Sequence, residues 1–426
     1  MKRVRNLYSW YFFIAIFILS SCNSSKSEKK AIQYGEATNE LVQMLDTNPE
    51  LKSLFIASIE KAKQVNPDTN TNPLQSLEKY YEFASKAETS PPWAVAKPGQ
   101  SISAKEDLFK FLCQFYFVVD QPLPQLEGKG YAYNSLQYVE PFASWLTRFN
   151  IAWRKYLDSK ESWNDRYYQM FRNDTLFGLQ KSWYEDSSNW KSFNQFFSRK
   201  LSSPAARPIA SPKNDSVVVS FADAEPQGVW AIDSNSNIIG KDGVPVKSAT
   251  IKSITKLLGD DSHYKNAFAN GTFTHSFLDV NDYHHYHIPI SGTVKEVRII
   301  QGINPTGGTI TWNSDQKRYA FNTSSVGWQM IETRGCVILE TDKYGLVGLL
   351  PIGMAVVGSV NFEDAIKVGT KVNKGDKLGY FLFGGSDFIM LFQSNVNFAL
   401  DSPKSADQNS YKHILMGERL GHLNKK

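Results

Sequence analysis

The spacing of apolar residues in the first half of the chain predicts helices. Asn48-Pro49 and Asn72-Pro73 each place proline where a helix is expected to begin. Ser103-Ala-Lys-Glu106 is a capping box, and it predicts the start of an apolar helix. Pro141 opens a further helical run from Phe142 to Leu157, whose aromatic residues recur at mixed helical spacing. We therefore expect a largely helical N-terminal region.

The pattern changes at about Ser216, where short β-branched runs separated by Gly and Asn turns begin. These runs predict strands at Val217–Val219, Thr293–Ile300, Thr309–Trp312, Tyr319–Phe321, Val337–Leu339, Leu346–Leu350 and Ile389–Leu391. Helices followed by strands, rather than strands alternating with helices, predict an α+β fold: a helical N-terminal domain followed by a β-rich domain.

The first residues have the pattern of a targeting segment. Met1–Arg5 is basic, and Trp10–Leu19 is apolar but too short for a comfortable membrane span. Leu19-Ser-Ser-Cys22 resembles the lipobox of bacterial lipoproteins, which implies a signal peptide over 1–21, an acylated Cys22 and a polar tether over 22–35. The expected location is the extracytoplasmic side of a bacterial membrane. An uncleaved anchor is the alternative.

Charge and cysteine content exclude some classes of function. The formal net charge of +5 falls to +2 once Lys2, Arg3 and Arg5 leave with the signal peptide. That balance is too small to indicate a nucleic-acid partner. Cys113 and Cys336 lie in apolar runs and are expected to be buried thiols, although an oxidising compartment would permit a bond between them.

A Gly-Gly-Ser sequence, residues 384–386, interrupts the apolar stretch from Leu378 to Phe392. A serine can attack the carbonyl before it only if no side chain obstructs the approach. Glycine at that position removes the obstruction and tolerates a strained backbone. An ordinary turn is the alternative interpretation.

Three of the seven histidines fall within four positions, in Asp282-Tyr-His-His-Tyr-His287. Histidine is the side chain best suited to moving protons near neutral pH. The H-x-x-H spacing of His284 and His287 also fits a metal site on a helix. However, Pro289 and Gly292 follow at once and favour a strand or loop, and no further ligands lie nearby. We therefore expect no metal, and buried core histidines remain an alternative.

Together these blocks resemble the phosphatidylserine decarboxylase family, which uses a pyruvoyl group. Asp282–Gly292 is similar to that family's Asp-Tyr-His-Arg-x-His-x-Pro-x-x-Gly signature, and Lys374–Ser386 resembles its cleavage region. Further blocks match in the same order: Phe196–Leu201 with Ala206–Ile209, Ser220–Ala224, Lys247–Gly259 and Gly353–Val360.

The resemblance implies a domain order as well. It covers residues from about 190 to 400, so we expect a helical domain over 36–190 and a catalytic domain over 191–426. Pieces of the helical half resemble a branch that includes fungal L-tryptophan decarboxylases. These pieces are Pro49–Phe55, Val119–Pro122 and Phe177–Trp183.

For this chain the resemblance implies self-cleavage. Ser386 would attack the Gly385 carbonyl, and the chain would break to leave a pyruvoyl group where Ser386 stood. The product would be a two-chain enzyme. The pyruvoyl ketone would capture an amine-bearing carboxylate substrate and accept the electrons released when carbon dioxide leaves.

The same resemblance assigns roles to other side chains. Asp223, His287 and Ser386 would form a triad-like unit in which His287 is the base. His284 would be the acid that returns a proton after decarboxylation. A turn carboxylate is the alternative interpretation of Asp223.

Three positions depart from the family pattern. Asp387 stands where Thr or Ser is usual, and a carboxylate beside the scissile bond is expected to oppose ester formation unless it points to the other face of a strand. Ala224 replaces a glycine. His285 replaces an arginine, so a permanent charge that could recognise phosphate or carboxylate is missing.

The predicted reaction is conversion of phosphatidylserine to phosphatidylethanolamine and carbon dioxide. Decarboxylation of a free aromatic amino acid such as L-tryptophan is the first alternative. A lipoprotein that keeps the fold but does not cleave, and acts as a binding module, is the second.

Overall fold

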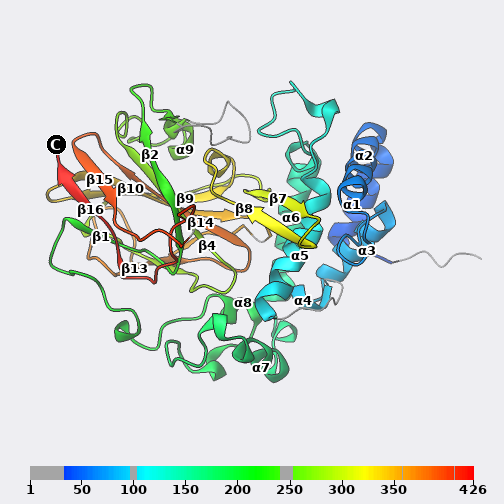
Figure 1. Ribbon diagram of the computed structural model, residues 1–426, viewed down its shortest axis with the longest axis horizontal. Coiled ribbons are helices and arrows are strands. Elements are labelled where there is room, and N and C mark those ends of the chain that lie inside the picture. Colours follow the sequence, from blue (N-terminus) through cyan, green and yellow to red (C-terminus); the bar gives the residue numbers. More distant parts are fainter. Residues whose placement is uncertain (1–32, 96–102, 240–252, 357, 407) are drawn as a thin grey trace, which may run out of the picture. The chain divides into compact units, whose positions relative to one another are not determined.

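Helices dominate the first part of the computed structural model, which describes residues 33–95, 103–239, 253–356, 358–406 and 408–426 (Figure 1). The predicted signal peptide, Cys22 and most of the tether lie outside these residues. The helices are α1 (Glu36–Thr47), α2 (Pro49–Val65), α3 (Leu77–Ala87), α4 (Pro92–Val95), α5 (Ala104–Val119), α6 (Phe142–Leu157), α7 (Asp165–Asn173), α8 (Phe193–Phe197) and α9 (Ile254–Leu258).

Most predicted helix starts are confirmed. The Ser103 hydroxyl accepts a hydrogen bond from the Glu106 amide at 3.1 Å, and α6 has the predicted bounds. The prediction at Pro73 is wrong, because α3 begins four residues later. The Asn72 side chain donates to the Asn66 carbonyl at 2.9 Å and holds this segment out of a helix, while Ser76 supplies the cap.

An antiparallel sheet of eight strands forms the second part, in the order β12-β6-β9-β10-β14-β4-β2-β3. Its strands are β2 (Glu225–Ile232), β3 (Ile238–Ile239), β4 (Thr272–Leu278), β6 (Gly292–Ile300), β9 (Thr333–Thr341), β10 (Gly345–Met354), β12 (Lys371–Val372) and β14 (Gly385–Phe392). Two three-stranded sheets and a hairpin complete the fold: β1 (Val217–Val219), β16 (Arg419–Lys425) and β15 (Val396–Leu400); β11 (Asn361–Phe362), β13 (Lys377–Tyr380) and β5 (His285–His287); β7 (Thr309–Asn313) and β8 (Arg318–Asn322).

Strand β14 lies inside the large sheet, between β10 and β4, and all eight of its residues are buried. Phe388, Met390 and Phe392 pack into the core on one face of the sheet. Ile389 and Leu391 pack into the core on the other face. A strand buried on both faces reads as a continuous apolar run, which is why its sequence lacks polar alternation.

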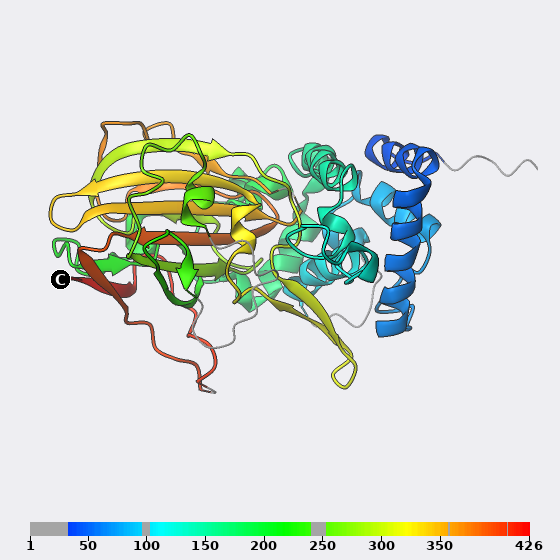
Figure 2. The same cartoon turned by 90° about the horizontal axis from the view of Figure 1, so that it is seen from above.

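A third core joins the helices to the strands. It gathers apolar side chains from α1, α2, α3, α5 and α6 and includes Val280, Ile310, Val356 and Phe383 from the strand-rich part. Figures 1 and 2 show the hairpin β7–β8 extending to α5. Residues from Tyr34 to Lys426 thus form one compact unit, and this core includes residues on both sides of the predicted boundary at 190/191.

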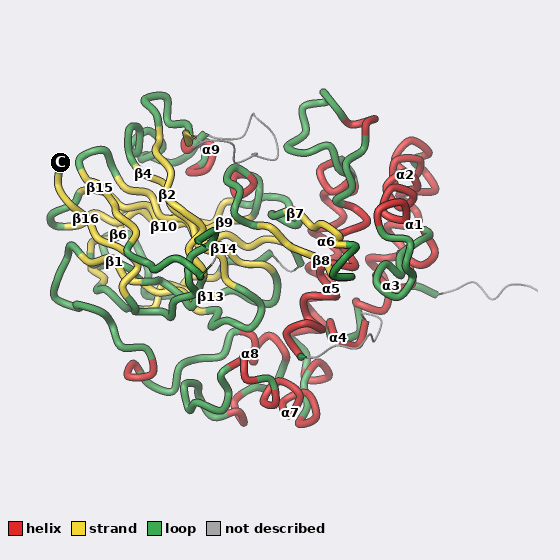
Figure 3. Tube along the Cα trace, in the orientation of Figure 1, coloured by secondary structure: helices red, strands yellow, loops and turns green. Residues whose placement is uncertain are grey.

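The predicted α+β class is confirmed, with helices before strands along the chain (Figure 3). Cys113 on α5 and Cys336 on β9 are buried, unpaired thiols. Within the described ranges, no helix combines the length and the apolar character needed to cross a membrane.

Candidate active site

The bond between Gly385 and Ser386 is the first peptide bond of β14. A Cβ added to Gly384, whose φ is +149°, would lie 1.9 Å from the Val356 carbonyl oxygen. A Cβ on Gly385 would lie 2.7 Å from the Met354 side chain. Both glycines are therefore required by close approach of the neighbouring chain, and they leave the carbonyl before Ser386 without a side chain beside it.

His284 is the imidazole that faces Ser386. Its Nδ1 lies 3.5 Å from the Ser386 Oγ, and its Nε2 lies 3.1 Å from the Asp279 carbonyl oxygen. A carbonyl only accepts, so Nε2 carries the proton and Nδ1 presents a lone pair to the serine. Burial, followed by the charge of Arg199, holds the pKa of His284 well below its usual value, so the ring is neutral.

Residues from α8 and the segment after it fix this histidine. The Phe197 ring stacks on the His284 ring with centroids 3.9 Å apart. The buried Arg199 guanidinium donates through Nη2 to the carbonyls of Asn281 and Asp282, at 2.7 and 2.9 Å. These bonds hold the turn that precedes His284, and they explain the position of the arginine in Phe196–Leu201.

His287 is held by different groups. Its Nδ1 donates to the Gly375 carbonyl at 2.8 Å, and its Nε2 lies 3.0 Å from the Tyr283 hydroxyl. Burial lowers the pKa of His287 to about 4, while the negative charge of Asp223 acts in the opposite direction. His287 is therefore also a neutral imidazole.

Asp223 forms a buried ion pair with Arg207. The guanidinium donates to both carboxylate oxygens, Nε at 3.0 Å and Nη2 at 2.6 Å. The Met416 amide donates to the same carboxylate at 2.8 Å. Among the described residues, the structure therefore joins Ser386 to His284 but does not link Asp223, His287 and Ser386 through direct hydrogen bonds.

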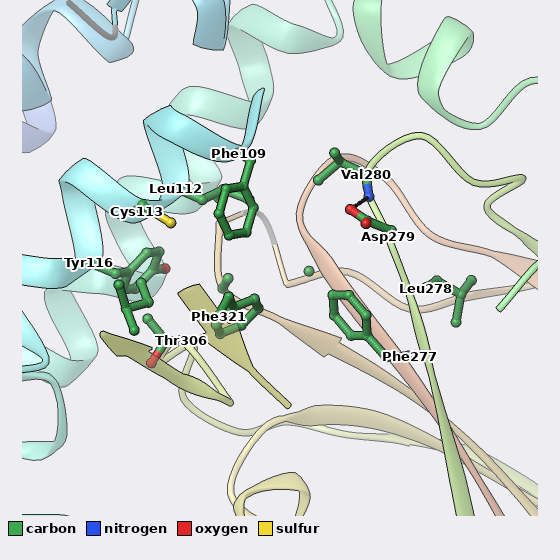
Figure 4. A pocket seen from close by; sticks show the side chains of 13 residues that line it. Phe109, Leu112, Cys113, Tyr116, Phe277, Leu278, Asp279, Val280, Thr306 and Phe321 are labelled. Atoms are coloured by element: carbon green, nitrogen blue, oxygen red, sulfur yellow. Dashed lines mark hydrogen bonds between the residues drawn. The ribbon is translucent and has the colours of Figure 1, made fainter. Parts of the chain in front are cut away.

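A small apolar cavity adjoins Gly385 (Figure 4). Helix α5 supplies Phe109, Leu112, Cys113 and Tyr116 to its wall, and β4 supplies Phe277 and Leu278. Among the described residues that line it, Asp279 alone is charged, and its carboxylate pairs with Lys105 at 2.5 Å. The helical region thus contributes directly to the surroundings of the scissile bond.

The family model for phosphatidylserine decarboxylase matches residues 193–422, which is more than half of the chain. The chain belongs to the phosphatidylserine decarboxylase family. The match runs from the start of α8 into β16 and includes all four residues predicted to act in the site. The resemblance drawn from the motifs is confirmed, and the family is one of carboxy-lyases.

Three curated relatives show the range of the family. Phosphatidylserine decarboxylase proenzyme 2 of Oryza sativa is 31% identical over 270 residues, covering 63% of this chain and 40% of the relative. The phosphatidylserine decarboxylase proenzyme of Fusobacterium nucleatum is 30% identical over 235 residues, covering 55% of this chain and 71% of the relative. Decarboxylase iboD of Amanita muscaria is 27% identical over 309 residues, covering 64% of this chain and 82% of the relative.

The family's usual arginine is replaced by His285, whose ring is buried. Its Nε2 donates to the Ser198 carbonyl at 2.9 Å, and burial lowers its pKa to about 3. The neutral state expected from the sequence therefore agrees with its surroundings. Ala224 is fully buried and exchanges backbone hydrogen bonds with Ile414, so a residue with a methyl side chain fits there.

Asp387 points away from Ser386, as the strand interpretation predicted. It lies in a buried network with His275 and Gln329 that no sequence pattern indicated. The contacts of Arg199 and Arg207 were also missed, because their partners lie 82 and 16 residues away in the sequence. The Tyr283–His287 contact spans only four residues and was missed as well. In the part of the chain that the structure describes, no group of three or more His, Cys, Asp and Glu side chains is arranged to hold a metal ion.

Proposed function

We propose that the chain is a pyruvoyl-dependent carboxy-lyase that cuts itself between Gly385 and Ser386 and converts phosphatidylserine to phosphatidylethanolamine and carbon dioxide. The observation that carries this proposal is the buried Ser386 hydroxyl facing a neutral imidazole directly after two sterically required glycines. Such a serine fits the precursor of a pyruvoyl group, because the carbonyl that it must attack is unobstructed.

Cleavage is an exchange of bonds between two residues. The Ser386 Oγ loses its proton and attacks the Gly385 carbonyl carbon. The C–N bond then breaks, the nitrogen takes a proton, and an ester remains. Loss of the Ser386 Cα proton expels the Gly385 carboxylate. Water then replaces the nitrogen, which leaves as ammonia, and a pyruvoyl group begins the smaller fragment of 41 residues, 386–426.

The roles of the two histidines are assigned from the family resemblance and from their contacts. Burial lowers the pKa of both histidines; the charge of Arg199 lowers that of His284 further, whereas the charges of Lys377 and Asp223 act on His287 in opposite directions. We assign to His287 the removal of the serine proton, the role that the resemblance implies, although its Nε2 lies against the Tyr283 hydroxyl in the uncut chain. The His284 Nδ1 lies 3.5 Å from the Ser386 Oγ, and we assign to His284 the return of a proton after carbon dioxide leaves.

The pyruvoyl group would supply a ketone that reacts with the substrate amine and withdraws electrons as the carboxylate is lost. Phosphatidylserine is supported by the family and by the names of the Oryza and Fusobacterium relatives. A second candidate is a free aromatic amino acid. Its support is the similarity to Decarboxylase iboD of Amanita muscaria, whose name does not mention phosphatidylserine.

Replacement of Ser386 by alanine is expected to leave the chain uncut, because no hydroxyl remains to attack Gly385. Denatured intact mass would show one species for Ser386→Ala and two for the wild type, with the smaller fragment carrying a pyruvoyl N-terminus. A single uncut chain in both samples would reject the enzyme and favour the binding-module interpretation.

The two histidine variants separate the assigned roles. His284→Ala is expected to cleave but to lose at least about a hundredfold in decarboxylation rate, the usual contribution of a positioned acid. His287→Ala is expected to remain uncut. Fragment masses and carbon dioxide release measure the two steps independently. An uncut His284→Ala chain would move the cleavage base to His284, as its contact with Ser386 also allows.

The substrate is tested by carbon dioxide release from two compounds, each labelled in its carboxyl group. Cleaved protein is expected to act on phosphatidylserine in mixed vesicles and not on L-tryptophan. Ser386→Ala protein, which lacks the pyruvoyl group, is the matched blank. Release from L-tryptophan alone would select the second candidate and reject phospholipid as the substrate.

We also propose that Cys22 carries a lipid anchor in the bacterial cell envelope. The support is the basic segment, apolar segment and lipobox order at the start of the sequence. The wild type is expected in the membrane fraction and to incorporate labelled palmitate. Cys22→Ala is expected to lose the label, and equal labelling of both would contradict the anchor.

A further inference from the structure

The residue after the scissile serine is anchored in a buried side-chain network. The Asp387 carboxylate oxygens lie 3.1 and 3.0 Å from the His275 Nδ1, and the Gln329 Nε2 donates to Oδ2 at 3.2 Å. All three side chains are at most 1% exposed. His275 lies on β4 and Gln329 in the short 3-10 helix Trp328–Met330, so the network ties β14 to two other elements.

The geometry of the network is fixed from outside. The Gln329 Oε1 accepts from the Gly327 amide at 2.9 Å, which turns its nitrogen toward Asp387. The Trp230 ring stacks on the His275 ring with centroids 5.1 Å apart. The His275 Nε2 has no hydrogen-bond partner in the described structure, so the ring bonds through Nδ1, which donates to the Asp387 carboxylate.

Packing alone does not require a carboxylate at position 387. The next residues on the same face of β14, Ile389 and Leu391, are apolar and fully buried. Removing a carboxylate from water costs several kcal/mol, and apolar side chains of similar volume often give equal or better stability. Burying the Asp387–His275 pair therefore lowers the stability of the fold at a position where an apolar residue would fit.

Cleavage makes residue 387 the only covalent attachment of the reactive residue 386. Before cleavage, the chain continues on both sides of Ser386. Afterwards the reactive group is the first residue of a fragment, and its only covalent tether is the bond to Asp387. Newly formed chain ends fray easily. The backbone of Ser386 pairs with Gly353 and Leu278, and the Asp387 side chain adds a lateral anchor one residue beyond the break.

We propose that Asp387, His275 and Gln329 form a positioning unit that fixes the start of β14 during cleavage and holds the reactive end of the smaller fragment afterwards. The proposal rests on the proposed function, since it requires cleavage at Ser386. It also accounts for a carboxylate next to the scissile bond: it faces the opposite side of the sheet and is bound to two donors, so it is turned away from the attacking hydroxyl.

The test compares variants that remove the network with and without leaving a buried polar group unpaired. Asp387→Ala is expected to slow fragment formation at least about tenfold, equivalent to about 1.4 kcal/mol, because the start of β14 loses its side-chain anchor. The double variant Asp387→Leu, His275→Phe removes both polar groups and refills the space. It is expected to keep its melting temperature but to form fragments slowly. A merely structural role would be satisfied by this variant.

A second measurement examines the cleaved protein. Hydrogen exchange at the amides of residues 387–392 is expected to rise in the double variant after cleavage and to stay low before it. Asp401→Asn is the matched control. It breaks another Asp–His pair in the same fragment, where the His422 Nδ1 lies 2.9 Å from Asp401, but far along the chain from the break. It is expected to cleave at the wild-type rate.

The outcomes are separable. If the wild type cleaves, and the double variant cleaves equally fast and is equally protected from hydrogen exchange, the positioning unit is overturned. The proposed function would then still stand. An uncut wild-type chain would overturn both. Slow cleavage in the double variant with an unchanged melting temperature and an unaffected Asp401→Asn control would support the unit.

Discussion

The site depends on the burial of one strand on both faces. Strand β14 is paired with β10 and β4 along its length, and its side chains alternate between two cores. A strand in this position cannot slip by one residue without exchanging every side chain between the faces. Register is thus fixed, and it places Ser386 on one face and Asp387 on the other.

This division separates reactivity from anchoring. The face of Ser386 carries neutral imidazoles whose charged forms are disfavoured by burial. The opposite face carries a carboxylate with two donors. In the proposed cleavage, a carboxylate on the same face as the serine would oppose the oxyanion expected at the Gly385 carbonyl. Because side chains alternate along a strand, the Asp387 carboxylate lies near the Gly385–Ser386 bond but on the face opposite to the Ser386 hydroxyl.

Local signals in the sequence were sufficient for several helices and strands but not for others, such as β2, β4 and β16, and they were insufficient for the contacts. The capping box at Ser103 and the run from Phe142 to Leu157 involve residues within a few turns of each other, and both predictions are confirmed. The helix start predicted at Asn72-Pro73 is wrong because Ser76, four residues after Asn72, is the residue that caps α3. Propensity is a weak guide where two start signals compete.

In the candidate site, too, local sequence signals did not predict which side chains meet. Motif order identified Ser386, His284, His287 and Asp223 as one group. Which imidazole faces the serine depends on how the Asp279 carbonyl and Phe197 orient the His284 ring. The partner of Asp387 is 112 residues away in sequence, on a neighbouring strand. Such pairings are set by sheet order, which no local pattern encodes.

The cavity beside Gly385 is lined by segments that lie far apart in the sequence. The family match begins at residue 193, yet four of the cavity's lining residues lie on α5, between Phe109 and Tyr116. The core shared by α5 and the strand-rich part fixes that helix against the catalytic strands. The four residues assigned to the reaction in the proposed function thus lie in the part that the family model matches, whereas one wall of the cavity beside Gly385 belongs to the helical region. A change in α5 can therefore alter the surroundings of this bond without changing any of those four residues.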